Sequence, residues 1–122
     1  MAAVVARWRE AQAASDQLWR VVKPQAMYKR PVPERHRLVF YLGHLEAFDW
    51  NLLWRDALSR PSKHAAWEQL FAFGIDPVDG QLPTDTPDDW PALDAVKSSS
   101  AALPADVDAV VRDAPFEDWL EH

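Results

Sequence analysis

The stretch from Glu34 to Leu58 constrains the fold most, because its apolar residues recur at the spacing of a helix. Five of them form one stripe that such a helix is expected to bury: Leu38, Tyr41, Leu45, Phe48 and Leu52. A glycine inside a helix costs about 1 kcal/mol relative to alanine. Gly43 therefore predicts a special reason such as the close approach of a neighbouring backbone. The stretch predicts one long amphipathic helix against which the rest of the chain packs.

Helical spacing also recurs in the other segments, and prolines or glycines separate them. We expect helices at 2–22, 62–73 and 105–113, a weaker helix from about Pro91, and the start of a last helix at 116–122. Gly74 is a natural helix stop. Ser98–Ser100 and Pro104 are expected to weaken the helix that begins near Pro91, so that it does not continue into the helix at 105–113. No alternating strand pattern exceeds a few residues. The predicted class is all-α, with the helices packed as an antiparallel bundle.

A long acidic, proline-rich loop is predicted between Gly74 and Pro91. A loop of this length without a pattern of its own is either functional or held in place by side chains. Ile75, Leu82 and Trp90 are the candidates for holding it. Asp89 or Asp94 is expected to cap the helix that follows.

The length and composition limit the classes of protein to which this chain can belong. A chain of 122 residues is long enough for one domain. Its net charge of −6 argues against a nucleic-acid partner, since phosphate binding needs an excess of Lys and Arg. The absence of cysteine excludes disulfides and thiolate metal sites and fits a cytoplasmic protein. The sequence has no secretory signal pattern and no apolar run long enough for a membrane.

Four histidines are the candidates for chemistry. His36 and His64 have polar neighbours and are expected to be exposed, and His122 stands in the last predicted helix. His44 lies at the edge of the apolar stripe, so it is either a hydrogen-bonded core residue or a metal ligand. No His-x-x-x-His or Glu-x-x-His pair is present. The paired carboxylates at 88–89 and 117–118 are typical of solvated loops and helix starts.

Several ordered blocks of residues carry a family resemblance. They are Tyr28-x-Arg30-Pro31-x-Pro33-x-Arg35-His36, Phe40-Tyr41-x-Gly43-His44-x-x-Ala47-Phe48-x-x-Asn51-Leu52, Leu70-Phe71-x-x-Gly74-Ile75-Asp76-Pro77 and Asp89-Trp90-Pro91. Over about residues 16–96 the chain resembles the DinB-like N-terminal domain of the sulfoxide synthases of ergothioneine biosynthesis (EgtB type). The resemblance implies a DinB/YfiT-like four-helix bundle.

The resemblance also implies a site for non-haem Fe(II) made of three histidines. It places the first ligand at His44 and the second at His122, where Glu121-His122 matches the start of the family's last-helix motif. The third ligand would lie four residues further on, beyond this sequence, so the last helix is only begun. Two histidines four residues apart share one face of a helix and can reach one ion. The family's second domain, related to the formylglycine-generating enzyme, completes the pocket in which iron and O₂ join a thiol to a histidine betaine, and it is absent from residues 1–122.

Three hypotheses follow. The chain is an iron-binding DinB-like module of such a synthase that is not catalytically complete alone. Alternatively, it is a non-catalytic helical remnant that binds a partner or itself. A third alternative is another DinB-type metal-dependent thiol transferase or isomerase. The expected partners are a second copy of the chain or the C-terminal domain that the family carries.

Overall fold

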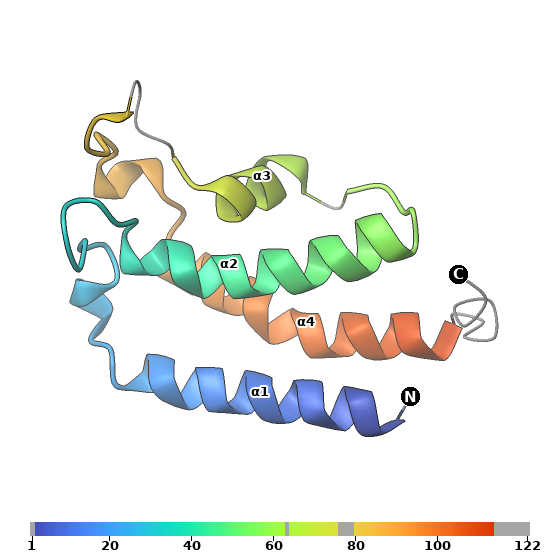
Figure 1. Ribbon diagram of the computed structural model, residues 1–122. Helices are drawn as coiled ribbons and strands as arrows, with labels where there is room; N and C mark the ends of the chain where they lie inside the picture. Colours follow the sequence, from blue (N-terminus) through green and yellow to red (C-terminus); the bar gives the residue numbers. More distant parts are fainter. Residues whose placement is uncertain (1, 63, 76–79, 114–122) are drawn as a thin grey trace.

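The computed structural model describes residues 2–62, 64–75 and 80–113, and all regular structure in these ranges is helical (Figure 1). The α-helices are α1 (Ala2–Arg20), α2 (Leu38–Trp50), α3 (Ala65–Phe73) and α4 (Leu93–Asp113). Figure 1 shows α1 running opposite to α2, and α3 opposite to α2 on its other side. The predicted all-α class is confirmed. The predicted helix start at 116–122 lies outside the described residues.

Helix α2 is the centre of the bundle and packs against both α3 and α4. It continues without a break into a π-helical segment, Asn51–Ala57. The residues that α2 buries are Val39, Phe40, Leu42, Gly43, Ala47 and Trp50. The prediction that the whole stripe is buried is therefore wrong for its last three residues. Leu45, Phe48 and Leu52 are exposed by 44%, 55% and 48%. The stretch is apolar on nearly every side, so spacing alone could not identify the face that neighbouring helices cover.

The glycines mark two places where side chains approach the backbone closely. A Cβ atom on Gly43 would meet the ring of Phe71, so a close neighbour at this position is confirmed, but it is a side chain and not the predicted backbone. The close neighbour is a ring of α3. Gly74 ends α3 with a positive φ of 73°, and its N–H donates to the Leu70 carbonyl at 2.7 Å. The predicted helix stop is therefore confirmed.

Helix α4 runs through the region where an interruption was predicted. Pro104 lies inside it, and the two predicted helices are one. An interior proline costs about 3 kcal/mol or more. Val96, Leu103, Val107 and Val110 nevertheless form one continuous buried face across the proline. Each buried Val or Leu contributes about 1.5–3 kcal/mol, so packing against α2 offsets the cost of the proline.

Helix α1 is attached by polar contacts as well as by the packing of Trp8 and Trp19 against the core. Trp8 Nε1 and Gln12 Nε2 both donate to the carboxylate of Asp49, each at 2.8 Å. Arg9 pairs with Asp108 of α4. Of the helices in the described ranges, none is both long enough and apolar enough to cross a membrane.

The loop before α4 is held in place near both of its ends. Trp90 is buried and Ile75 packs against the core, as expected, but Leu82 is exposed and holds nothing. Tyr28 donates its hydroxyl hydrogen to the Pro91 carbonyl at 2.8 Å. Asp89 does not cap α4. It accepts from the Thr86 N–H at 2.6 Å and so caps the short 3₁₀ turn Pro87–Asp89.

Candidate functional site

His44 extends from the middle of α2 toward the C-terminal end of α3. Its Nδ1 lies 2.6 Å from the backbone carbonyl oxygen of Phe71. A carbonyl can only accept a hydrogen bond, so Nδ1 carries the proton and donates it. The last carbonyls of a helix lack partners within that helix, and His44 supplies one for Phe71. In the neutral imidazole, Nε2 is then left with a lone pair that this bond does not use.

Aromatic rings border His44 on both sides along α2. The Phe40 ring stacks on the imidazole with the centroids 4.9 Å apart, and the Phe48 ring lies 6.3 Å away. Phe40 is buried and Phe48 is exposed, so the half-buried His44 stands at the edge of the core. The hydrogen bond agrees with the core interpretation of His44. It is equally the bond that an orienting group makes to a metal-ligating histidine.

The other histidines do not join His44 in a common site within the described residues. His36 is half-buried, with its ring 4.1 Å from that of Phe40 and over the Cα of Gly74, so its predicted exposure is wrong. His64 is exposed, as predicted, and its Nδ1 accepts from the Trp67 N–H at the start of α3. His122 lies outside the described residues. Among the residues described, no three His, Cys, Asp or Glu side chains are grouped so that they could hold a metal ion.

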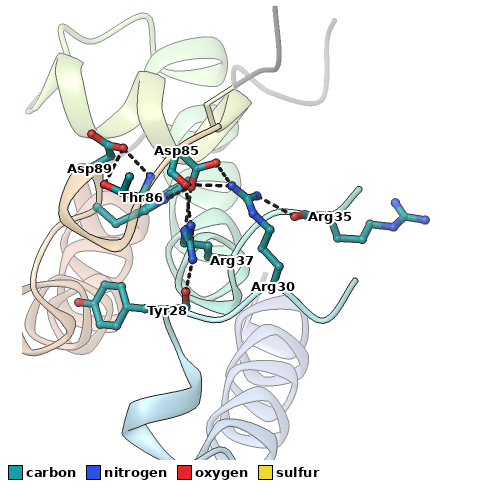
Figure 2. A network of polar contacts seen from close by, with 8 residues as sticks. Tyr28, Arg30, Arg35, Arg37, Asp85, Thr86 and Asp89 are labelled. Carbon is teal, nitrogen blue, oxygen red and sulfur yellow. Dashed lines mark hydrogen bonds and ion pairs between the residues drawn. The ribbon is translucent and has the colours of Figure 1, made fainter. Parts of the chain in front are cut away.

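A buried ion network joins two loops beside the start of α2 (Figure 2). The Asp85 side chain is 0% exposed and pairs with Arg30 and Arg37. Arg37 Nε donates to Asp85 at 3.0 Å, and Trp90 Nε1 donates to the same carboxylate at 2.7 Å. Both guanidinium groups also donate to backbone carbonyls. Arg37 Nη1, for example, donates to the Tyr28 carbonyl at 2.5 Å. The network fixes Arg37, which directly precedes α2, against the loop of Asp85.

Charge and hydrogen bonds decide the ionisation of Asp85. Burial alone would raise the pKa of this carboxyl group. The hydrogen bonds from Trp90, Arg30 and Arg37 and the positive charge of Arg30 outweigh burial and hold the pKa of Asp85 below its ordinary value. Asp85 is therefore a structural anion at neutral pH.

A second carboxylate lies in a small cavity between α2, α3 and α4. The cavity has a volume of about 120 Å³, and Glu46, Glu68 and Asp106 are among its lining residues. Ser99 and Ser100 of α4 donate hydroxyl hydrogens to Glu46 at 2.5 and 3.0 Å. Burial raises the pKa of Glu46, the two serine hydroxyls lower it by less, and the negative charge of Asp106 raises it further.

The structural roles of Asp85 and Glu46 were not predicted from the sequence. Asp85 stands in a loop with several other aspartates, and no local pattern distinguishes it from its solvated neighbours. Its arginine partners are 55 and 48 residues away. The sequence predicts that Ser99 and Ser100 weaken a helix. Glu46 occupies their hydroxyls, so they serve as contacts between α2 and α4.

Comparison with known proteins gives one partial similarity. The chain is 30% identical over 95 residues to Ergothioneine biosynthesis protein 1 of Neurospora crassa. The match covers 73% of this chain and 11% of that protein, so the chain spans about a ninth of the length of this curated relative. No family model matches the chain. No solved structure matches it.

Proposed function

We propose that this chain is a DinB-like helical module of an iron-dependent sulfoxide synthase in ergothioneine biosynthesis. In this proposal His44 is one of three histidine ligands of non-haem Fe(II), and His122 is the second. The third histidine would lie outside residues 1–122. The similarity to the Neurospora protein named for ergothioneine biosynthesis supports the pathway. A DinB-type thiol transferase or isomerase would use the same ligands, and this similarity favours the synthase.

The hydrogen bond from His44 Nδ1 to the Phe71 carbonyl carries the assignment of His44. A metal-bound histidine generally donates its other ring N–H to a carbonyl or carboxylate, which fixes its tautomer and its orientation. The Phe71 carbonyl belongs to a helix end and is held there by the packing of the Phe71 ring under Gly43. His44 can therefore present Nε2 to an ion without changing tautomer.

The described residues fit one position of the proposed site. They supply the imidazole of His44, and among them no group of three ligating side chains occurs. When bound, Fe(II) would supply the activation of O₂. The role of the described residues is to hold His44 as a ligand. The Phe71 carbonyl orients its ring, and Phe40 stacks against it. One or two imidazoles bind a metal far more weakly than a preorganised set of three.

The experiment is an anaerobic Fe(II) titration of the purified chain, followed by metal analysis. The matched control is His64→Asn, because His64 is exposed and asparagine can replace it as a helix cap. We expect His44→Ala to weaken Fe(II) binding by about tenfold or more and His64→Asn to leave it unchanged. Equal binding by wild type and His44→Ala would refute the assignment and leave the chain as a helical module without this ligand.

A further inference from the structure

The cavity between α2, α3 and α4 is separate from the candidate iron ligand. His44 is not among its lining residues, although the adjacent Gly43 is. Its volume is about 120 Å³, whereas a single water molecule needs about 10–15 Å³ of such space. Two of the residues that line it, His64 and Ala102, are exposed. A molecule of a few non-hydrogen atoms can therefore enter the cavity from solvent.

Three helices each contribute one carboxylate to the lining of this cavity. They are Glu46 of α2, Glu68 of α3 and Asp106 of α4, and the described residues of the lining include no lysine or arginine. Neighbouring negative charges disfavour one another, and a cation among them stabilises all of them. Within the described ranges, however, no three such side chains are close enough together to hold a metal ion. The cavity therefore favours a cation that is larger than a metal ion.

Aromatic rings form another part of the wall. Trp50, Trp67 and Phe71 line the cavity, and the rings of Trp67 and Phe71 meet edge to face with their centroids 5.5 Å apart. The faces of such rings attract cations, and they also cover hydrocarbon groups. This wall suits an organic cation with a short apolar part.

Neighbouring donors hold two of the carboxylates in place. Glu46 accepts from the hydroxyls of Ser99 and Ser100 at 2.5 and 3.0 Å, and Glu68 accepts from the backbone N–H of His64 at 3.2 Å. An ionised carboxylate has about four acceptor positions, so Glu46 can accept further bonds from an occupant. The acceptors are therefore oriented before any ligand arrives, which lowers the cost of binding.

We propose that this cavity binds a small primary alkylammonium ion, with its N–H groups directed to the three carboxylates and its alkyl chain against Trp67 and Phe71. A primary ammonium group has three N–H donors, one for each helix that contributes a carboxylate. A quaternary ammonium ion has the same charge but no N–H donor, so it would contact the rings without bonding to the carboxylates. The site does not include His44, and its test contains no metal, so this proposal and the iron proposal can fail separately.

The probe is ethylammonium chloride, titrated into ¹⁵N-labelled protein at neutral pH, with sodium chloride used to keep the total chloride concentration constant. The indole N–H signals of Trp50 and Trp67 report occupancy, because both rings line the cavity. The limited binding energy of a ligand with so few atoms predicts half-saturation at about 1–10 mM. Tetramethylammonium chloride, which lacks N–H donors, should need a concentration at least about tenfold higher.

A matched pair of variants tests the contribution of the carboxylates. Glu46→Gln keeps the shape of the side chain and removes its charge, and it should raise the half-saturation concentration of ethylammonium about tenfold. Glu10→Gln, at an exposed position of α1, should leave it unchanged. Circular dichroism confirms that both variants are folded.

Three results would overturn the proposal. They are indole shifts that do not saturate, equal half-saturation by ethylammonium and tetramethylammonium, and an unchanged half-saturation concentration in folded Glu46→Gln. The comparison of the two cations uses the wild-type protein alone, so it decides the question even if the variant does not fold.

Discussion

Buried Asp85 and half-buried Glu46 show how the environment of a carboxylate differs between two regions of this small bundle. Asp85, beside the start of α2, has two arginines and an indole N–H around it. Glu46, where α2 faces α4, has two serine hydroxyls and a neighbouring carboxylate. The pKa of Asp85 is lowered and that of Glu46 is raised. Burial acts in the same direction on both groups, so the partners decide the sign.

The two regions have different structural roles. The network of Asp85 fixes the beginning of α2, from which Phe40 and His44 follow within two turns. Ionised Glu46 faces two serine hydroxyls and the negative charge of Asp106, so its contact with α4 is made at some cost in stability. The first region holds the candidate ligand in place, and the second is expected to tolerate loss of charge.

Loss of the charge of Asp85 is expected to have the largest effect. Asp85→Asn keeps the shape of the side chain but leaves Arg30 and Arg37 partly buried without their anion. We expect the free energy of unfolding to fall by about 3–5 kcal/mol, measured by denaturant titration at pH 7. Asp88→Asn, an exposed position in the same loop, is the control and should be neutral. Equal stability of the two variants would show that the network contributes little.

The pH dependence of stability should change in the same variant. The pKa of Asp85 is lower in the folded state than in the unfolded state. Its contribution is therefore present above the unfolded value of about 3.9 and is lost as the pH falls through the folded value. Wild type should lose up to about 1.4 kcal/mol per pH unit from this group in that window. Asp85→Asn should lack this share of the slope, and identical acid slopes would contradict the assignment.

Removal of the charge of Glu46 should have a smaller effect of opposite sign. The pKa of Glu46 is raised in the folded state, so its contribution is complete below the unfolded value of about 4.3 and is lost as the pH rises through the folded value. Glu46→Gln should therefore be more stable than wild type at pH 7, by about 0.5–1 kcal/mol, and should show no such gain at pH 4. Exposed Glu10→Gln serves as the control. A loss of stability at pH 7 would mean that the ionised carboxylate is favourable.

The smallest effect is expected on the exposed side of α2. Leu45 is 44% exposed and lies on the predicted stripe that the structure leaves uncovered. Leu45→Gln should change the free energy of unfolding by less than about 0.5 kcal/mol, as measured by thermal unfolding. Leu42→Gln, on the buried side of the same helix, is the contrast and should be strongly destabilising. A comparable loss in Leu45→Gln would mean that this side is covered in solution.

The features predicted well from the sequence are local ones. Gly43 and Gly74 could be interpreted because a glycine inside a helix indicates a close neighbour and a glycine after one indicates its end. The features missed depend on distant partners. The face of α2 that is buried depends on where α3 and α4 lie, and the continuity of α4 through Pro104 depends on its packing against α2. Asp85 could not be distinguished from other loop aspartates without the fold that brings Arg30 and Arg37 to it.

The central claim concerns one nitrogen atom of His44, and NMR of ¹⁵N-labelled histidine tests it most directly. Long-range ¹H–¹⁵N spectra assign the tautomer of each ring, and anaerobic addition of paramagnetic Fe(II) broadens the signals of the atoms it binds. We predict a proton on Nδ1 of His44 and selective broadening at its Nε2, with the exposed His64 unaffected. A proton on Nε2 of His44, or broadening of His64 without His44, would contradict the claim.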